Sequence, residues 1–199
     1  MEKIDIQDGW LMYDPHFFSV QESDQLFQEL FQMNTWEQGN VTIFGKGYHT
    51  PRLESFHAET GLSYGYSGQR MKTNELTVVL RSIGVKLMEK CGHPFNSVLC
   101  NLYRDGNDSN GWHADNEPEL GRDPIIASVS FGAKRRFDLR HNLSGEKRSF
   151  ELNHGSLLIM GGSIQHHWKH QIAKSKKISD PRINLTFRNI VRRSVESTE

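Results

Sequence analysis

The chain lacks several features that would mark a specialised class of protein. Its 199 residues include two cysteines, and no apolar run approaches the roughly 20 residues that a membrane-spanning helix requires. Cys91 and Cys100 form neither a C-x-x-C pair nor a disulfide framework, which favours a reducing compartment. The N-terminal stretch MEKIDIQDGW is too acidic and too polar for a secretory signal peptide. We therefore expect no membrane partner, and a cytoplasmic location in a bacterium or a nuclear one in a eukaryote.

An excess of charge of one sign is also absent. Lysine and arginine together number 24, and aspartate and glutamate also number 24, so the formal net charge is zero with histidine neutral. This balance argues against a strongly basic coat for nucleic acid, but a few well-placed cations suffice to contact phosphates. Repeats, low-complexity tracts and linkers are missing too, and hydrophobic residues make up 36% of the chain. We therefore predict one folded domain over residues 1–199, present as a monomer.

The first half of the sequence contains helical periodicity. Apolar residues recur at helical spacing within residues 21–33, which predicts an amphipathic helix. Thr73 or Asn74 can cap a second helix that runs to about Lys90. Residues 38–68 are rich in Gly, Tyr and Ser, which predicts an irregular or hairpin lid.

Beyond Gly92 the pattern changes to short β-branched and aromatic segments separated by turn-forming residues. Strands are expected at residues 97–103, 125–131, 134–140, 148–152, 155–160, 166–172 and 182–190. Many short strands with tight turns are typical of an antiparallel sandwich or jelly roll. The predicted fold class is therefore mainly β with flanking helices. Residues from about 1 to 95 hold the helices and the lid, and residues from about 96 to 192 form the core.

The stretch GWHADNE contains two good metal ligands, His113 and Asp115. In extended chain, residues i and i+2 point to the same side, so the two ligands can act together. A hydrogen-bonded polar turn would explain the same pair. A metal site needs a third ligand, and the later stretch HHWKH offers three histidines. On a strand, His166 and His170 would share one face and His167 would point the other way, and one of these completes a 2-His-1-carboxylate set suited to Fe(II).

Two arginines in the stretch RINLTFR strengthen the case for such a site. Arg182 and Arg188 lie six residues apart, which on a strand sends both to one face together with Asn184 and Thr186. Buried guanidinium groups are costly unless they meet anions, and arginine binds carboxylates in a bidentate manner. A dicarboxylate would satisfy both arginines. One buried salt bridge plus one surface arginine is the alternative.

Several stretches together resemble one known family. NLYRDG, HADNE, PIIASVSFGAKRRFDLRH, LNHGSLLIMGG, HHWKH and PRINLTFR are similar in order and spacing to the AlkB family of Fe(II)/2-oxoglutarate dioxygenases, and most similar to its members that repair alkylated double-stranded DNA. The resemblance covers residues from about 40 to 192. It implies a double-stranded β-helix (jelly-roll) core, an N-terminal nucleotide-recognition lid, and the use of Fe(II), 2-oxoglutarate and O₂.

The resemblance also implies roles for individual residues. His113, Asp115 and His170 would bind iron, His170 because it holds the family position in HWxH. Arg182 would bind the distal carboxylate of 2-oxoglutarate, and Arg188 would approach the other end of 2-oxoglutarate, near the iron. Hydrogen bonds to 2-oxoglutarate would come from Asn101, Tyr103 and Thr186.

On the substrate side, the resemblance implies alkylated DNA, with duplex favoured. Tyr64 and Tyr66 would stack on the extruded base, although lid packing explains a Tyr-x-Tyr pair equally well. VTIFGKG resembles the finger hairpin of duplex-acting members, whose apolar tip replaces a flipped base. Lysines after the last histidine would contact phosphates, unless they lie in a solvated loop. The expected substrate contacts are Ile43, Phe44, Gly45, Arg52, Tyr64, Tyr66, Asn116, Glu117, Lys176 and Lys177.

The sequence therefore predicts an oxidative demethylase that repairs N-alkylated bases such as 1-methyladenine and 3-methylcytosine, releasing succinate, CO₂ and formaldehyde. A related dioxygenase acting on single-stranded DNA, RNA or protein is one alternative. A catalytically silent nucleic-acid-binding module is another. One departure from the family pattern, Gly161 and Gly162 where a bulkier polar stretch is common, has no explanation in the sequence.

Overall fold

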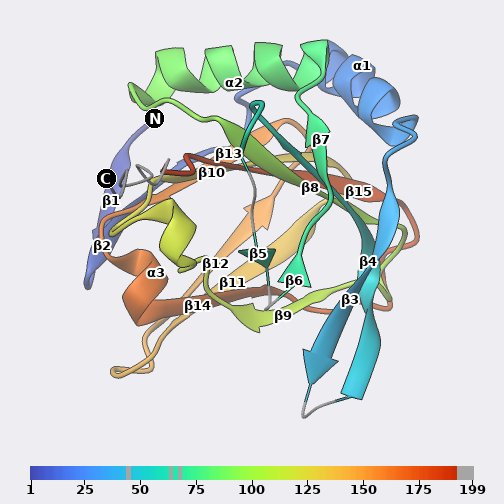
Figure 1. Cartoon of the computed structure of the whole chain (residues 1–199). Helices are drawn as coiled ribbons and strands as arrows, with labels where there is room; N and C mark the ends of the chain where they lie inside the picture. Colours follow the sequence, from blue (N-terminus) through green and yellow to red (C-terminus); the bar gives the residue numbers. More distant parts are fainter. Residues whose placement is uncertain (44–45, 63–64, 67–68, 192–199) are drawn as a thin grey trace, which may run out of the picture.

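Two antiparallel sheets face each other in the computed structural model, which describes residues 1–43, 46–62, 65–66 and 69–191 (Figure 1). The large sheet has nine strands in the order β1-β2-β13-β10-β15-β8-β4-β3, and β7 pairs with the end of β4. The small sheet has the order β12-β11-β14-β9. This two-sheet, mostly antiparallel architecture confirms the predicted fold class, a jelly-roll core with flanking helices.

The strands and helices are short, as the turn-rich sequence predicts. The strands of the large sheet are β1 Lys3–Ile6, β2 Gly9–Asp14, β3 Glu37–Ile43, β4 Lys46–Ala58, β7 Thr73–Glu75, β8 Ser97–Tyr103, β10 Ile126–Gly132, β13 Ser156–Gly161 and β15 Arg182–Arg188. The small sheet contains β9 Asn110–His113, β11 Arg135–His141, β12 Lys147–Leu152 and β14 Trp168–Ile172, and a separate pair is β5 Gly65–Tyr66 with β6 Gln69–Arg70. The helices are α1 Val20–Phe31, α2 Val78–Cys91, α3 Ile164–His167 and a 3₁₀ turn at Pro118–Leu120.

Helices α1 and α2 cover the outer face of the large sheet (Figure 1). Leu30 of α1 and Leu80, Ile83 and Leu87 of α2 are buried against the outward apolar residues of the central strands. Ser19 begins α1 with a capping box, in which its side chain accepts from the Glu22 N–H while the Glu22 carboxylate accepts from the Ser19 N–H. No helix among the described residues is long and apolar enough to cross a membrane.

The two sheets enclose a second apolar core beside the polar site. Leu139 of β11 and Trp168 of β14 meet Leu158 and Met160 of β13 in this core, and all four are buried. Its side chains come from alternate positions of facing strands, as expected for two stacked sheets. The polar cavity described below lies beside this core and is lined by residues of β8, β9, β14 and β15.

Three details of the sequence prediction were wrong. Helix α2 is capped by Thr77, not by Thr73 or Asn74, because residues 73–75 pair with β4 as a strand. Of the two forms expected for residues 38–68, irregular or hairpin, the hairpin is present, since β3 pairs with β4, whose second half is buried in the large sheet. Strands β1 and β2, which carry no strong alternation, went unpredicted and pair onto β13.

The third error concerns HHWKH. His166 and His167 lie in α3, and only Trp168–Ile172 forms a strand, so His166 and His170 do not share a strand face. Gly161 now has an explanation: it lies opposite Trp10 of β2, and a Cβ at this position would collide with the Trp10 ring. Gly162 has a positive φ of 71°, which a larger residue rarely adopts.

Candidate active site

Three potential metal ligands from two segments converge between the sheets. His113, the last residue of β9, is paired directly with His170 of β14, and Asp115 follows two residues later. The two imidazole centroids are 4.2 Å apart, and one ligand atom from each of the three residues lies within 4.8 Å of the others. Asp115 and His170 are buried, while 23% of the His113 side chain is exposed. This geometry fits a 2-His-1-carboxylate set on one side of a metal ion.

Hydrogen bonds hold His113 in the tautomer that a metal requires. Its Nδ1 lies 2.7 Å from the carbonyl oxygen of Gly111. A carbonyl only accepts, so Nδ1 carries the proton and Nε2 keeps its lone pair. Nε2 is 3.1 Å from Asn110 Nδ2 and 4.0 Å from Asp115 Oδ1. A backbone acceptor on the far nitrogen is the usual support for a ligating histidine.

Gln165 is a supporting residue that sequence reasoning missed. Its Oε1 accepts from the backbone N–H of Asp115 at 2.9 Å, and the side chain is buried. The contact exists because α3 turns back against the segment that follows β9. Only the nearness of Gln165 to the HHWKH stretch pointed to it in the sequence.

The charges around the triad prepare it for a cation. Arg188 Nη2 lies 3.0 Å from Asp115 Oδ2. Burial acts to raise the pKa of Asp115, but the charge of Arg188 and those of the two histidines outweigh it and lower this pKa to about 2. Burial lowers the pKa of His170 to about 3 and also lowers the pKa of His113. Near neutral pH the site therefore has one carboxylate and two neutral imidazoles, the protonation states that bind a divalent metal.

The even spacing in RINLTFR places its polar residues in one row, as predicted. A cavity next to the triad is lined by β8 and β15 residues that face the small sheet, namely Asn101, Tyr103, Asn184, Thr186 and Arg188. Arg182 pairs with Tyr103 in the strand register, and Asn184 pairs with Asn101. Ser128 is a further polar residue of this cavity, and its Oγ accepts a hydrogen bond from Asn184 Nδ2 at 3.0 Å.

Arg182 fits an anionic ligand. It is fully buried, and its Nη2 donates to Ser130 Oγ at 2.9 Å and to Asn184 Oδ1 at 3.2 Å. Within the described part of the chain, its Nε and Nη1 have no hydrogen-bond partner. Burial lowers the pKa of Arg182 to about 10, whereas Tyr103 acts to raise it. A buried guanidinium without a carboxylate is costly, so the carboxylate of a bound ligand suits this position. Asp115 Oδ1 likewise lacks a hydrogen-bond partner among the described residues, as suits a metal ligand.

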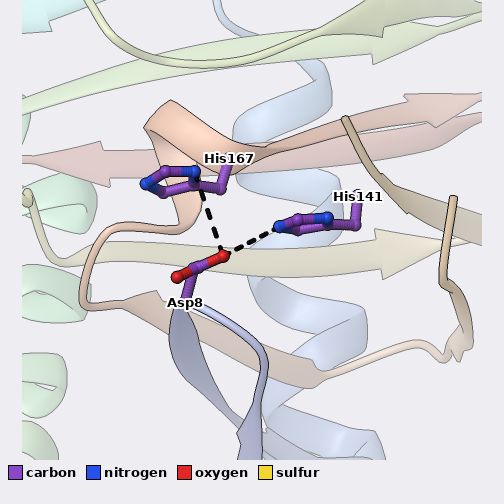
Figure 2. A group of neighbouring side chains, drawn as sticks. All are labelled: Asp8, His141 and His167. Carbon is purple, nitrogen blue, oxygen red and sulfur yellow. Dashed lines mark hydrogen bonds and ion pairs between the residues drawn. The ribbon is translucent and has the colours of Figure 1, made fainter. Parts of the chain in front are cut away.

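A second cluster contains the same residue types. Asp8, in the β1–β2 turn, lies between His141 at the end of β11 and His167 of α3 (Figure 2). Asp8 Oδ2 is 2.9 Å from His141 Nε2 and 3.9 Å from His167 Nδ1. The imidazole rings are nearly parallel, with an interplanar angle of 13°.

The tautomer of His141 argues against a metal at this second cluster. The backbone N–H of Ser144 donates to His141 Nδ1 at 3.0 Å. Nδ1 is therefore an acceptor, so Nε2 carries the proton and donates it to Asp8. A metal ligand needs the opposite arrangement. We interpret this cluster as an anchor for the β1–β2 turn, whose Asp8 carbonyl also accepts from Ser163 Oγ.

The structure describes some of the predicted substrate contacts and not others. Phe44, Gly45 and Tyr64 lie outside the described residues. Ile43 ends β3 and Tyr66 lies in β5, but only their backbone positions are described.

The remaining predicted contacts lie around the triad and the adjoining loop. Asn116 is exposed and Glu117 half-buried, directly after the triad, and Lys176 and Lys177 are exposed. Arg52 is buried, whereas a residue that contacts a nucleotide at the surface would be exposed. It forms an ion pair with Glu54, and its Nε donates to Asn101 Oδ1 at 2.8 Å. Arg52 thus supports a predicted 2-oxoglutarate residue, and its contact with nucleotide stays a prediction.

The triad, the buried arginine and the two-sheet fold together are the features of the class of iron- and 2-oxoglutarate-dependent oxygenases. Residues 11–188 match the family described as the 2OG-Fe(II) oxygenase superfamily, and the chain belongs to this superfamily. The description of this superfamily names Fe(II) and 2-oxoglutarate, and the His113, Asp115 and His170 triad with the buried Arg182 fits both.

Relatives in the AlkB group are similar over most of the chain. The alpha-ketoglutarate-dependent dioxygenase alkB homolog 3 of Homo sapiens is 41% identical over 186 residues, which cover 88% of this chain and 64% of that protein. The DNA oxidative demethylase ALKBH2 of Mus musculus is 39% identical over 185 residues, which cover 87% of this chain and 77% of that protein. The chain thus spans less than two thirds of the length of the human alkB homolog 3. A solved structure titled "The structure of OsALKBH1" shares the fold, with a TM-score of 0.67, 15% identity, and coverage of 93% of this chain and 100% of that one. The AlkB resemblance of the sequence is confirmed.

Proposed function

We propose that the protein removes N-alkyl groups from DNA bases by oxidation. The observation that carries the proposal is the His113, Asp115 and His170 triad on one polar cavity, with the buried Arg182 beside Tyr103 of the cavity's lining. The similarity to relatives named DNA oxidative demethylase supports DNA as the substrate class. Iron bound with 2-oxoglutarate and O₂ supplies hydroxylation of an N-methyl carbon, after which the product releases formaldehyde.

The chain's own residues orient the reactants. His113, Asp115 and His170 would hold iron from one side and leave the other side open. Arg182 would bind the distal carboxylate of 2-oxoglutarate, with Tyr103 beside it. The guanidinium carbon of Arg182 is 5.1 Å from the Tyr103 ring centroid, and Tyr103 lines the cavity.

An Arg182 substitution tests the co-substrate position. We expect Arg182→Gln to raise the KM for 2-oxoglutarate at least ~10-fold, because a charge-assisted hydrogen bond contributes ~1.5–3 kcal/mol. Arg81→Gln is the control, since Arg81 is exposed on α2 and does not line the cavity. An unchanged KM in Arg182→Gln would place the distal carboxylate elsewhere. Succinate formation at graded 2-oxoglutarate concentrations is the measurement.

The decisive experiment for the substrate is release of formaldehyde from a 1-methyladenine oligonucleotide. The reaction would contain Fe(II), 2-oxoglutarate and ascorbate, and mass spectrometry would follow the base. Repair of the oligonucleotide supports the proposal. Succinate formed without any repair would contradict DNA dealkylation and leave an oxygenase for another substrate, such as RNA or protein.

We further propose that duplex DNA is the favoured form. The β3–β4 hairpin projects from the body of the molecule (Figure 1). The sequence predicts an apolar finger in the stretch that joins these two strands, and damaged bases that pair poorly are extruded at lower cost. Phe44→Ala should lower repair of the duplex more than repair of the single strand. Equal losses on both substrates would exclude the wedge role.

Phosphate contacts have a candidate surface beside the loop after β14. Lys174 and Lys177 line a groove together with Lys134 and Arg136 from the start of β11. Asp138 and Glu151 also line the groove and pair with Arg136 and Lys134, so Lys174 and Lys177 are the cations proposed to attract the DNA backbone. The groove supports the proposed role of the lysine-rich loop, including Lys176.

A further inference from the structure

Strand β9 contains an irregularity that turns one polar side chain toward the triad. His113 pairs with His170 of β14, and Asn110 pairs with Ile172, so two residues separate the pairs on β9 where one residue separates them on β14. In a regular strand, positions 110 and 113 would face opposite sides, because side chains alternate. The extra residue makes a β-bulge, a feature that often re-aims a side chain next to an active site. It brings Asn110 and His113 to the same cavity.

The amide of Asn110 lies beside the atom of His113 that would bind the metal. Its Nδ2 is 3.1 Å from Nε2 of His113. The carbonyl of Gly111 holds the His113 proton on Nδ1, so Nε2 is an acceptor and Asn110 donates this hydrogen bond. Within the described part of the chain, the Asn110 side chain makes this hydrogen bond and no other.

A metal ion on His113 would take the acceptor of this hydrogen bond. Nε2 has a single lone pair, so the Asn110 N–H needs another partner once a metal is bound. Asn110 is half-buried, and Phe137 and Ile172, which line the cavity from the same sheet, are apolar. A donor that is shielded from water and unpaired destabilises the state that contains it. The metal-bound state therefore requires an acceptor close to the metal.

Two acceptors of the described cavity lining are already used. Asp115 Oδ2 lies 3.0 Å from Arg188 Nη2, and its Oδ1 is the atom left for the metal. Asn101 Oδ1 accepts a hydrogen bond from Arg52 at 2.8 Å. An oxygen of a ligand that binds the same metal is the acceptor that fits the position of Asn110.

We propose that Asn110 binds the metal-bound end of 2-oxoglutarate, with its amide N–H turning from Nε2 of His113 to an oxygen of the 2-oxo acid group. This group provides the oxygens that bind the metal, whereas the distal carboxylate is the part proposed to meet Arg182. Asn110 and Arg182 thus act at opposite ends of one molecule. The inference rests on the proposed function, since it assumes an oxygenase that uses 2-oxoglutarate, but it requires no particular nucleic acid.

Anaerobic binding measurements test this contact in the absence of turnover. Protein loaded with Fe(II) is titrated with 2-oxoglutarate, and the visible charge-transfer absorption of an iron-chelated 2-oxo acid gives the Kd. Asn110→Leu removes the donor and keeps a side chain of similar size. Asn34→Leu is the matched control, because Asn34 is exposed in the turn that follows α1.

We expect Asn110→Leu to bind 2-oxoglutarate ~10-fold more weakly, because hydrogen bonds to charged groups are among the stronger ones. Its affinity for Fe(II) should equal or exceed that of the unmodified protein, because the competing hydrogen bond on Nε2 is gone. A purely structural role would lower both affinities together. A loss of Fe(II) affinity, or a 2-oxoglutarate affinity equal to that of Asn34→Leu, would overturn the inference.

Titration with 2-oxobutyrate locates the contact on the co-substrate. This acid has the 2-oxo acid group and lacks the distal carboxylate. Asn110→Leu should weaken binding of 2-oxobutyrate and of 2-oxoglutarate by the same factor, whereas Arg182→Gln should weaken binding of 2-oxoglutarate alone. An effect of Asn110→Leu confined to 2-oxoglutarate would place its contact at the distal end and contradict the inference.

A second variant keeps the test valid if Asn110→Leu does not fold. Asn110→Asp keeps the shape of the side chain and replaces the donor by a carboxylate. It should weaken binding of both acids more than Asn110→Leu does, because two anionic groups would face each other. Unchanged binding of both acids in Asn110→Asp would likewise overturn the inference.

Repair assays on the same proteins keep the two proposals separate. If the unmodified protein repairs 1-methyladenine and its 2-oxoglutarate affinity does not depend on Asn110, the inference is wrong and the proposed function stands. If no repair occurs and the affinity for both acids still depends on Asn110, the inference stands and DNA is not the substrate.

Discussion

The molecule contains two clusters of one aspartate and two histidines, and they differ in where a single proton lies. In the triad, the backbone carbonyl of Gly111 holds the proton of His113 on Nδ1, so the lone pair that can bind a metal is on Nε2. In the cluster of Figure 2, the backbone N–H of Ser144 faces Nδ1 of His141, so the proton lies on Nε2 and points at Asp8. The neighbouring backbone group, and not the residue types, decides which cluster can bind iron.

The surroundings reinforce this difference. Asp115 is buried and paired with Arg188, whereas 37% of the Asp8 side chain is exposed. The triad opens to a polar cavity, and Arg182 lies buried behind that cavity's lining. In the other cluster, Asp8 is part of the turn that joins β1 to β2, and the two histidines hold this turn in place. A metal site thus needs a histidine held in the right tautomer and a space for its reactants. The two clusters contain the same residue types, so composition does not distinguish them.

The largest difference between the two clusters should appear in iron binding when one histidine is removed from each cluster in turn. His113→Ala should abolish iron binding and lower dealkylation more than ~100-fold, because even residues that support a metal ligand contribute ~10–100-fold. His141→Ala should keep the iron content, measured by metal analysis of the purified protein. Loss of iron in His141→Ala with retention in His113→Ala would reverse the assignment of the two clusters.

A smaller effect is expected from the groups that support each cluster. Gln165→Leu removes the acceptor of the Asp115 N–H and should weaken iron binding ~10–100-fold. Ser144→Ala keeps the backbone N–H that faces His141, so its iron affinity should equal that of the unmodified protein. Titration with Fe(II) under anaerobic conditions measures both. Equal affinities in the two variants would remove Gln165 from the site.

The pH dependence of the metal-free protein gives a third distinction. Burial lowers the pKa of His170 to about 3, below its ordinary value of 6.5. Between these values the unfolded chain binds more protons than the folded one, so the free energy of unfolding should fall as pH falls from 6.5 toward 3. Asp115 acts in the same direction, since its pKa of about 2 makes it lose stabilisation at still lower pH. Urea unfolding should show this slope, and His170→Gln should flatten it; an unchanged slope would contradict the assigned cause.

The smallest effect should be structural and confined to the second cluster. Asp8→Ala removes the acceptor of the His141 Nε2–H, which should cost about 1 kcal/mol and lower the Tm by ~2–4 °C. Iron binding should not change. Calorimetry of the metal-free protein measures the shift. A large gain in Tm on adding zinc to the unmodified protein, absent in Asp8→Ala, would show that the anchor binds metal after all.

The sequence predicted those parts that depend on regular local patterns. The alternation in RINLTFR placed Arg182 and Arg188 on one face correctly, because β15 is an uninterrupted strand. The ligand pairing of His113 with His170 came from family resemblance, since no local rule brings β9 beside β14. The residues missed, such as Gln165, act through contacts between segments far apart in the chain.

The errors share a physical origin. Several residues before α2 have side chains that can cap a helix. Because residues 73–75 pair with β4 as strand β7, the helix can begin only after them, and Thr77 is its N-cap. In HHWKH, a short helical turn replaces half of the expected strand because His166 and His167 hydrogen-bond back to Ser163. The exposed residues of β1 gave no alternation to detect, and its pairing depends on β2.

The order of strands in the large sheet also bears on how the protein is synthesised. Strand β2, near the start of the chain, pairs with β13, and β15 lies between β10 and β8. On a ribosome, the first strands must wait until residues beyond 156 have emerged before their pairing partner exists. The sheet closes only with β15, which also carries the arginines of the site. Contacts of such long sequence separation slow folding, so a truncated nascent chain would expose unpaired edges and depend on chaperones until its last strand arrives.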